Sequence, residues 1–222
     1  MSWLSPYTFS SESNTDKRQE LLSMLEQVDH KLMEIDNECA KEQMVIQREF
    51  DKKKRPIFEE RKSIIEKIPK FWADTISRHP IFLENMHPED YDVLELLKDV
   101  ELEDNLDNEG SYKIKLIFDE AVLEIMEPNV LVKHIVFKDN EESVQELTEI
   151  KWKKESPRSL IEKKFAGEIG SDDKLKGSIV SFFDFFSKDI SDEGIDIGEI
   201  IRRDIYHAPL LYYCEDDLNS SV

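Results

Sequence analysis

The segment from Asp16 to Phe50 constrains the fold most, because it contains no glycine and no proline over its whole length. Its apolar positions are spaced alternately four and three residues apart, with one break at Glu42 before the last of them. They are Leu21, Leu25, Val28, Leu32, Ile35, Cys39 and Ile46. This heptad spacing predicts a long α-helix with a single apolar seam. Thr15 or Asn14 is expected to cap its start.

The seam needs a partner, since one amphipathic helix cannot bury its own apolar stripe. A helix of roughly 35 residues would span about 50 Å, which is longer than a domain of this size can cover. The length therefore favours a homodimer through the seam. Packing of the helix on its own domain is the alternative.

Charge is distributed unevenly along the chain. The 222 residues contain 50 acidic and 30 basic side chains, a net charge of −20. Almost the whole imbalance lies after residue 80, because the first 80 residues are close to neutral. Direct binding of nucleic acid is disfavoured, because a phosphate backbone needs compensating Lys and Arg. A basic partner drawn in by a negative field is favoured.

The cysteines, the hydropathy and the N-terminal segment indicate the cellular compartment. The two cysteines, Cys39 and Cys214, lie far apart, and Cys39 falls on the predicted seam. An intrachain disulfide is therefore not expected, and the pair fits a reducing compartment. No run of about 18 apolar residues is present, so no membrane span is predicted. Residues 1–15 lack the pattern of a signal peptide and are expected to form a flexible leader.

A basic run, Lys52 to Arg55, precedes Pro56. It is interpreted either as a solvated helix end or as a nuclear import signal. Pro56 is expected at the first turn of a new helix or at a kink. A second helical pattern covers 57–72 with a kink at Pro69, and helix is expected to stop before Pro80.

The remainder predicts an α+β body. A short helix is expected around 88–97, and residues 112–118 alternate polar and apolar as a half-buried strand does. Further strands are expected over 121–125, 131–137 and 147–152 in an antiparallel meander, with turns at 108–110 and 139–141. Loop and short helix are expected over 157–175, and helices over the aromatic segment 179–186 and over 197–206.

No constellation for catalysis is apparent. The sequence lacks a phosphate-binding loop and a nucleophile elbow. The five histidines lack metal-ligand spacing; they are His30, His79, His87, His134 and His207. We therefore expect no enzyme activity, no catalytic residue, no cofactor and no metal. The aromatic cluster Phe182 to Phe186 is expected in the core, with a partner groove as the alternative.

Four blocks resemble the nucleosome assembly protein (NAP/SET) family. The segment Arg55 to Arg61 with Ile68-Pro69-Lys70-Phe71-Trp72 and His79-Pro80 looks like the family signature. Residues 148–153 resemble its Ile-x-Trp-Lys strand end, and 181–186 resemble its Ser-Phe-Phe-x-Phe-Phe block, with Asp184 where Asn is common. Residues 197–213 are similar to its closing helix. The blocks lie in the family's order over about residues 16–215, and the absence of an inserted helix points to the compact SET-like branch.

The resemblance implies a histone chaperone. Its fold would be a long dimerisation helix, pairing antiparallel with its twin, followed by an α+β earmuff domain with an antiparallel sheet and packed helices. It would bind core histones and assemble or exchange them without ATP, in the nucleus and with shuttling to the cytoplasm left open. A chromatin-modifying enzyme is a further expected partner. A coiled-coil adaptor or inhibitor of another basic nuclear protein is the alternative function.

The predicted organisation is a leader over 1–15, a dimerisation helix over 16–55, an earmuff domain over 56–215 and a short acidic tail over 216–222. Many members of the family carry a longer acidic tail. A naturally short tail and a trimmed chain both remain open. Candidate histone contacts are the acids Glu101, Glu103, Asp104, Asp192, Glu193, Asp196 and Glu199. Solvated surface acids are the alternative for each of them.

Overall fold

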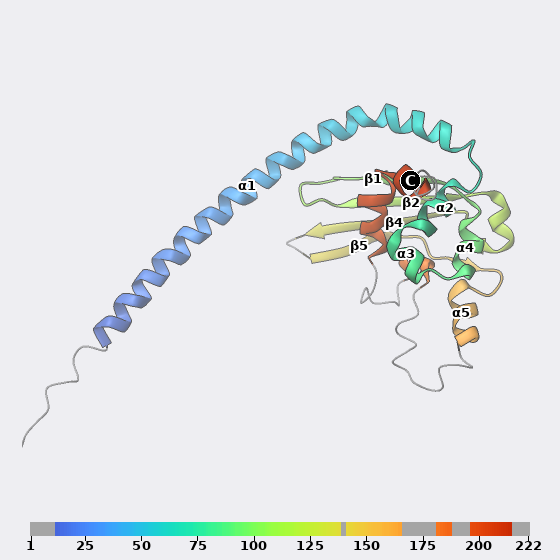
Figure 1. The fold of residues 1–222 in the computed structure, drawn as a ribbon. Helices are drawn as coiled ribbons and strands as arrows, with labels where there is room; N and C mark the ends of the chain where they lie inside the picture. The colour runs from blue at the N-terminus through green and yellow to red at the C-terminus, as the bar shows by residue number, and fades with distance from the viewer. Residues whose placement is uncertain (1–11, 139–140, 166–180, 188–195, 215–222) are drawn as a thin grey trace, which may run out of the picture. The chain divides into compact units, whose positions relative to one another are not determined.

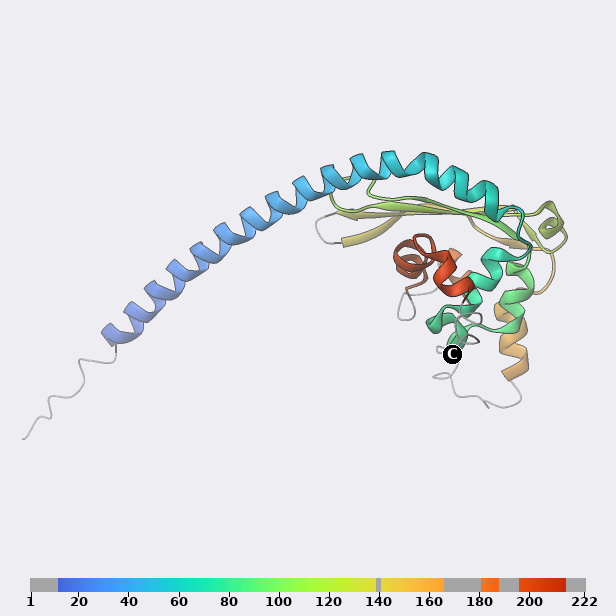
Figure 2. The ribbon, with the colours of Figure 1, turned by 45° about the horizontal axis from the view of Figure 1, so that its top comes forward.

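A computed structural model of the chain describes residues 12–138, 141–165, 181–187 and 196–214. The described part divides into two compact units, one ending at Gln47 and the other beginning at Arg48. The first unit is a single stretch of helix α1, which spans Glu12–Ile65. The second contains the last part of α1 and an α+β body (Figures 1 and 2).

Helix α1 is longer than predicted and runs through Pro56. A proline inside a helix removes one N–H donor and favours a kink, so a new helix was expected there. The helix instead ends at Ile65, just before Pro69 and Lys70. Lys70 has a left-handed backbone with φ of 58°, a conformation that does not propagate an α-helix. The expected kinked helix over 57–72 is therefore two helices with a break between them.

Three short helices follow the break. They are α2 (Phe71–Arg78), α3 (Pro80–Asn85) and α4 (Pro88–Leu94). The predicted stop at His79-Pro80 is confirmed, because Pro80 is the first residue of α3 and His79 before it is extended. A proline at this position loses no intrahelical hydrogen bond.

The sheet of the body has four antiparallel strands in the order β1-β2-β4-β5. They are β1 (Leu97–Glu103), β2 (Tyr112–Phe118), β4 (Val130–Lys138) and β5 (Glu141–Leu147). A second, two-stranded sheet pairs β3 (Met126–Glu127) with β6 (Lys151–Trp152). The strands predicted at 112–118 and 131–137 are confirmed, as is the antiparallel arrangement.

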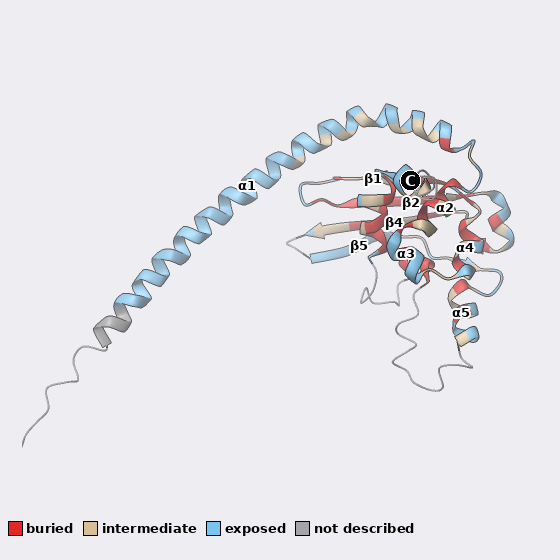
Figure 3. Ribbon diagram, viewed as in Figure 1, coloured by how far each residue is buried: buried red, intermediate tan, exposed pale blue. Residues whose placement is uncertain are grey.

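One face of the four-stranded sheet carries the core. Alternate residues of β2 and β4 are buried there, among them Ile114, Leu116 and Leu131, each at 0% exposure. The helical segments near the C-terminus lie on this face (Figure 2). They are η2 (Phe182–Phe186), α7 (Ile197–Ile200), η3 (Ile201–Ile205) and α8 (Pro209–Tyr213). Figure 3 shows that the buried residues gather between these layers.

Several predicted elements were wrong. Residues 121–125 are not a strand: they fall largely in the 3₁₀ turn η1 (Glu120–Glu124), because Asp119 caps it by accepting from the Ala121 amide. The strand expected at 147–152 is divided: Leu147 ends β5, residues 148–150 are loop, and Lys151–Trp152 form β6. Strand β1 was not predicted. The aromatic segment forms the 3₁₀ turn η2, begun by a capping box between Ser181 and Asp184.

The remaining predictions for the C-terminal half are largely confirmed. Helix α5 covers Pro157–Phe165. Helices α7 and η3 together form the helix that was predicted over 197–206. All four phenylalanines of η2 are buried, which confirms the core interpretation. Cys39 and Cys214 are both free. Residues 1–11, 166–180 and 215–222, which include most of the predicted leader and the acidic tail, lie outside the described residues. Because α1 begins at Glu12, residues 12–15 of the predicted leader are helical, and the helix does not start at Thr15 or Asn14.

Candidate functional site

The predicted acids Glu101, Glu103 and Asp104 come together at the end of β1. In the register of the sheet, Glu101 lies opposite Lys115 and Glu103 opposite Lys113. Because alternate residues of a strand face opposite sides, both glutamates lie on the face turned away from the core helices. Asp104 directly follows the strand.

These acids line a cavity of about 330 Å³, here called the acidic cleft. It lies between the last part of α1, the end of β1 and the turn after η3. Its lining residues are Asp51, Arg55, Phe58, Glu59, Glu101, Leu102, Glu103, Asp104, Tyr206 and His207. Five carboxylates thus face one guanidinium around an apolar and aromatic base. A basic side chain with an aliphatic stem fits such a lining, since its stem packs on apolar surface while its charge meets the acids.

The α1 wall of the cleft is held by Arg61. Its guanidinium lies 4.7 Å from the ring centre of Phe58 and 4.8 Å from that of Tyr206. The same group donates to the Tyr206 carbonyl at 2.7 Å. The rings of Phe58 and Tyr206 are themselves 5.1 Å apart. The base of the cleft is therefore a stacked, hydrogen-bonded unit with few conformational options.

The carboxylates of the cleft are not equally available to a partner. Glu101 accepts from Lys62 at 2.9 Å and from Lys115 at 3.0 Å. Burial works to raise the pKa of Glu101, but these two lysines lower it below its usual value. Asp104 accepts from Arg202 at 2.7 Å.

Glu59 and Glu103 are exposed, and none of the described basic groups forms an ion pair with them. Their carboxylates are the ones most available to a partner, although the charge of Glu103 also raises the pKa of Lys113 opposite it.

Two further predicted acids, Asp196 and Glu199, interact within the chain at α7, the first as its N-cap and the second on the helix. Asp196 caps the helix by accepting from the Glu199 amide at 2.9 Å. Glu199 accepts from Arg202 at 3.0 Å, so Arg202 joins it to Asp104. Asp192 and Glu193 lie outside the described residues.

Helix α7 approaches the sheet closely because residue 198 is a glycine. A Cβ there would lie 2.6 Å from the Tyr112 hydroxyl and 3.0 Å from Phe185. Burial raises the pKa of Tyr112, and the negative charges of Asp196, Glu199 and Glu142 raise it further. Glu142 at the start of β5 is thus a third acid of this region, which sequence reasoning missed.

The predicted seam of α1 is exposed in the single chain. Its leucine, valine and isoleucine members have exposures between 50% (Val28) and 62% (Ile35). In the α1 segment of the second unit, Phe50, Ile57 and Ile64 are exposed as well, at 52%, 64% and 53%. These three are spaced seven residues apart, and that spacing was the signal that could have predicted them.

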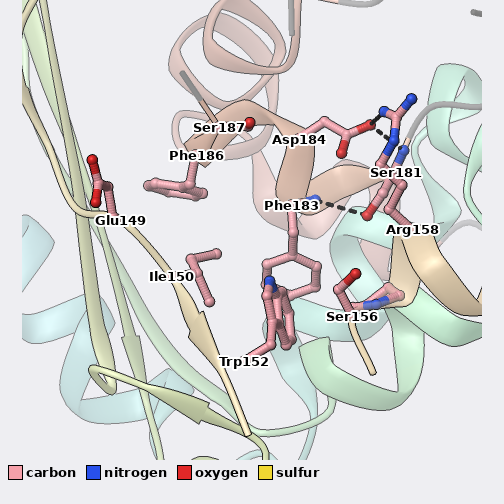
Figure 4. Close-up of a pocket in the computed structure, with 11 residues that line it drawn as sticks. Glu149, Ile150, Trp152, Ser156, Arg158, Ser181, Phe183, Asp184, Phe186 and Ser187 are labelled. Carbon is pink, nitrogen blue, oxygen red and sulfur yellow. Dashed lines mark hydrogen bonds and ion pairs between the residues drawn. The ribbon is translucent and has the colours of Figure 1, made fainter. Parts of the chain in front are cut away.

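A second cavity of about 560 Å³ has a different character (Figure 4). Ile150, Trp152, Phe183 and Phe186 form its apolar wall. The guanidinium of Arg158 on its polar side bonds Asp184 at 2.6 Å. Because this ion pair joins two lining residues, the cavity offers a cationic ligand less free charge than the acidic cleft does.

A metal-binding cluster is missing from the part of the chain that the structure describes. No group of three or more His, Cys, Asp and Glu side chains there is placed to hold a metal ion. His79, at 4% exposure, packs against the rings of Phe82 and Tyr212, as a structural residue does. No described helix is long and apolar enough to cross a membrane.

Known proteins are similar to this chain in sequence and fold. The sequence model of the family named nucleosome assembly protein (NAP) matches residues 66–216. An aspartic acid-rich protein of Plasmodium falciparum is 45% identical over 181 residues, which cover 81% of this chain and 69% of that protein. Protein SET of Drosophila melanogaster is 25% identical over 219 residues, covering 95% and 79%. The crystal structure of nucleosome assembly protein S from Plasmodium falciparum superposes with a TM-score of 0.68 at 42% identity, covering 86% and 99%.

Proposed function

The chain belongs to the nucleosome assembly protein family, and from that premise we propose that it is a histone chaperone. It binds core histones through acidic surface and promotes nucleosome assembly or histone exchange without ATP. The family match over residues 66–216 carries the proposal. The acidic cleft supports it, because a cluster of carboxylates around an aromatic base suits the lysine and arginine side chains of a basic protein.

The proposed mechanism is competition with DNA phosphate. A chaperone must hold the basic groups of a histone strongly enough to prevent disordered binding to DNA, and weakly enough to release it. One exposed ion pair contributes about 0–1 kcal/mol, so affinity has to come from many charges on a rigid frame. The surplus of 19 acidic charges after residue 80 supplies the charges, and the sheet with its packed helices supplies the frame.

Dimerisation through α1 is part of the proposal. The exposed seam Leu21, Leu25, Val28, Leu32, Ile35, Cys39 and Ile46 would be covered by the same seam of a second copy. Two acidic bodies joined in one particle bind one histone assembly with a higher effective concentration than separate bodies do. The chaperone would act in the nucleus as a non-enzymatic protein that contacts histones and not DNA directly. Contact with a chromatin-modifying enzyme is compatible with this role.

The first test is the salt dependence and selectivity of binding. Titration of the chain with core histones should give submicromolar affinity that weakens as salt rises, because exposed charges are screened. Lysozyme, an unrelated basic protein, should bind at least about tenfold more weakly. Equal affinity for both proteins would favour an adaptor for basic proteins in general, and affinity indifferent to salt would contradict the electrostatic mechanism.

The second test locates the site. Glu59→Lys with Glu103→Lys reverses the two cleft charges that have no described ion-pair partner, so the fold should survive. Histone affinity should fall about tenfold or more, because two attractive contacts become repulsive. Glu26→Lys with Glu38→Lys makes the same charge change in the part of α1 that ends at Gln47, outside the cleft, and is the matched control. Loss of binding in the control alone would show that the histone site lies outside the cleft.

A further inference from the structure

Strand β5 forms one edge of the sheet, and no other described strand pairs with its outer side. The strand order places it at one end, bonded to β4 on a single side. Residues 141–146 are all exposed, and only Leu147 is half-buried. The opposite edge strand, β1, lies against α1, whose Lys62 bonds Asp99 at 2.7 Å and Glu101 at 2.9 Å.

An unpaired edge presents a row of backbone N–H and C=O groups to solvent. Natural sheets protect such edges with lysine, proline, short strands or bulges. Strand β5 has seven residues and contains neither lysine nor proline. A register shift near its end leaves Gln145 without a partner on β4. The stretch from Glu141 to Val144 keeps a regular register and is long enough to template another strand.

The charges of β5 are acidic on both faces. Glu142 lies opposite Phe137 and Val144 opposite Ile135, on the face that carries the core. Glu141 and Glu146 lie on the other face, opposite Lys138 and His134. Glu146 also pairs with Lys113 of β2 at 2.9 Å. A strand added beside β5 would therefore meet a carboxylate on whichever face its charged side chains point.

We propose that β5 binds an extended basic segment of a partner protein as a fifth strand of the sheet. Main-chain hydrogen bonds would supply affinity, and cross-strand pairs of lysine or arginine with the three glutamates would select for basic sequence. A second copy of β5 is disfavoured, because it would bring three more glutamates alongside these. The identification of this segment as part of a histone rests on the proposed function. The binding of a basic strand to the β5 edge does not.

The first experiment separates strand addition from plain charge attraction. The full chain is titrated with a short peptide of alternating lysine and threonine, and with the same peptide N-methylated at alternate backbone positions. The two probes carry equal charge, but the second lacks the N–H donors of one edge. It should bind about tenfold or more weakly, because several backbone hydrogen bonds are lost. Equal affinity would overturn the proposal.

Amide hydrogen exchange then locates the contact. The unmodified peptide should slow exchange within 141–147, and the N-methylated peptide should not. Glu141→Gln, Glu142→Gln and Glu146→Gln together should weaken the unmodified peptide about tenfold. Glu20→Gln, Glu26→Gln and Glu38→Gln together remove the same charge from exposed positions of α1 outside the acidic cleft; this control should retain most of the affinity. Protection of β5 that rises with protein concentration in the absence of peptide would assign the edge to a second copy and overturn the proposal.

Histones with and without their extended tails distinguish this inference from the proposed function. If the parent chain binds neither form, the chaperone proposal fails. If it binds both equally and β5 remains unprotected by the peptide, the chaperone proposal stands and the edge proposal fails. Stronger binding of the tailed form, lost in the triple Gln variant, is the result that supports the edge.

Discussion

The part of α1 that ends at Gln47 and the body that begins at Arg48 use apolar residues in opposite ways. Leu32 on α1 is 55% exposed, whereas Ile76 in the body is fully buried. Both residues follow a regular apolar pattern, so the pattern alone does not decide burial. What differs is the packing within each unit: the body brings its own layers together, while the described residues up to Gln47 form one helix alone. The comparison predicts that one unit depends on association and the other does not.

The largest expected effect comes from placing charge on the seam. Leu25→Glu with Leu32→Glu should convert a dimer to a monomer, measured as mass by light scattering. An uncompensated carboxylate in an apolar interface costs several kcal/mol, so the dissociation constant should rise more than about a thousandfold. The melting of the body should change little, because its core is separate.

The matched control adds the same charge away from the seam. Gln27→Glu with Asn37→Glu lies off the apolar stripe and should leave the dimer intact. A dimer mass for the Leu25 and Leu32 variant would place the interface elsewhere and remove the contrast between the two units.

A deletion in the body should have the complementary effect. Phe183 is 5% exposed and packs at right angles to Trp152, with ring centres 5.4 Å apart. Phe183→Ala should lower the free energy of unfolding by about 3–5 kcal/mol and leave the dimer mass unchanged. Urea unfolding measures the change. Leu83→Ala, at a residue 70% exposed, should shift the same curve by less than about 0.5 kcal/mol.

The sequence predicts elements whose pattern reflects burial on one face. The alternation in 112–118 is visible because Ile114 and Leu116 face the core while Lys113 and Lys115 do not. Strand β5 is exposed on both faces, so its sequence has no alternation to detect. Strand β1 contains acids at Asp99 and Glu101 whose partner, Lys62, is far away in the sequence. No local pattern reveals such a neutralised charge.

The candidate site is predictable only in part, for the same reason. Acidic charge after residue 80 indicates a basic partner, and three of the predicted acids do meet in the acidic cleft. The other wall of the cleft comes from α1 through Asp51 and Glu59, because the chain folds back on that helix. Spacing along the sequence also cannot show that Arg202 neutralises Asp104.

A third prediction concerns a buried carboxyl group of the body. Asp90 has 0% exposure and accepts from the Ser181 hydroxyl at 2.5 Å. Burial raises its pKa from 3.8 to about 6. The folded state therefore holds this proton more tightly than the unfolded state, and stability should fall as pH rises from about 4 to about 6.

Asp90→Asn keeps an acceptor for Ser181 and removes the titration. It should raise the free energy of unfolding at neutral pH by up to about 3 kcal/mol and flatten the pH profile in that window. Urea unfolding at several pH values checks both. A pH profile identical to that of the parent would show that Asp90 is not the titrating group.

The smallest expected effect tests where the two units stop being independent. Ile57 lies on the α1 segment of the second unit, yet it is 64% exposed, so it contributes little to the core of the body. In the monomeric Leu25 and Leu32 variant, Ile57→Ala should change the free energy of unfolding by less than about 0.5 kcal/mol. In the parent it should weaken the dimer about tenfold, since Phe50, Ile57 and Ile64 repeat at the spacing of the seam and burying an isoleucine contributes about 1.5–3 kcal/mol. Sedimentation at graded concentrations measures the second effect. An unchanged dissociation constant would show that the dimer interface ends before Phe50. A large loss of stability in the monomer would show that Ile57 belongs to the core of the body.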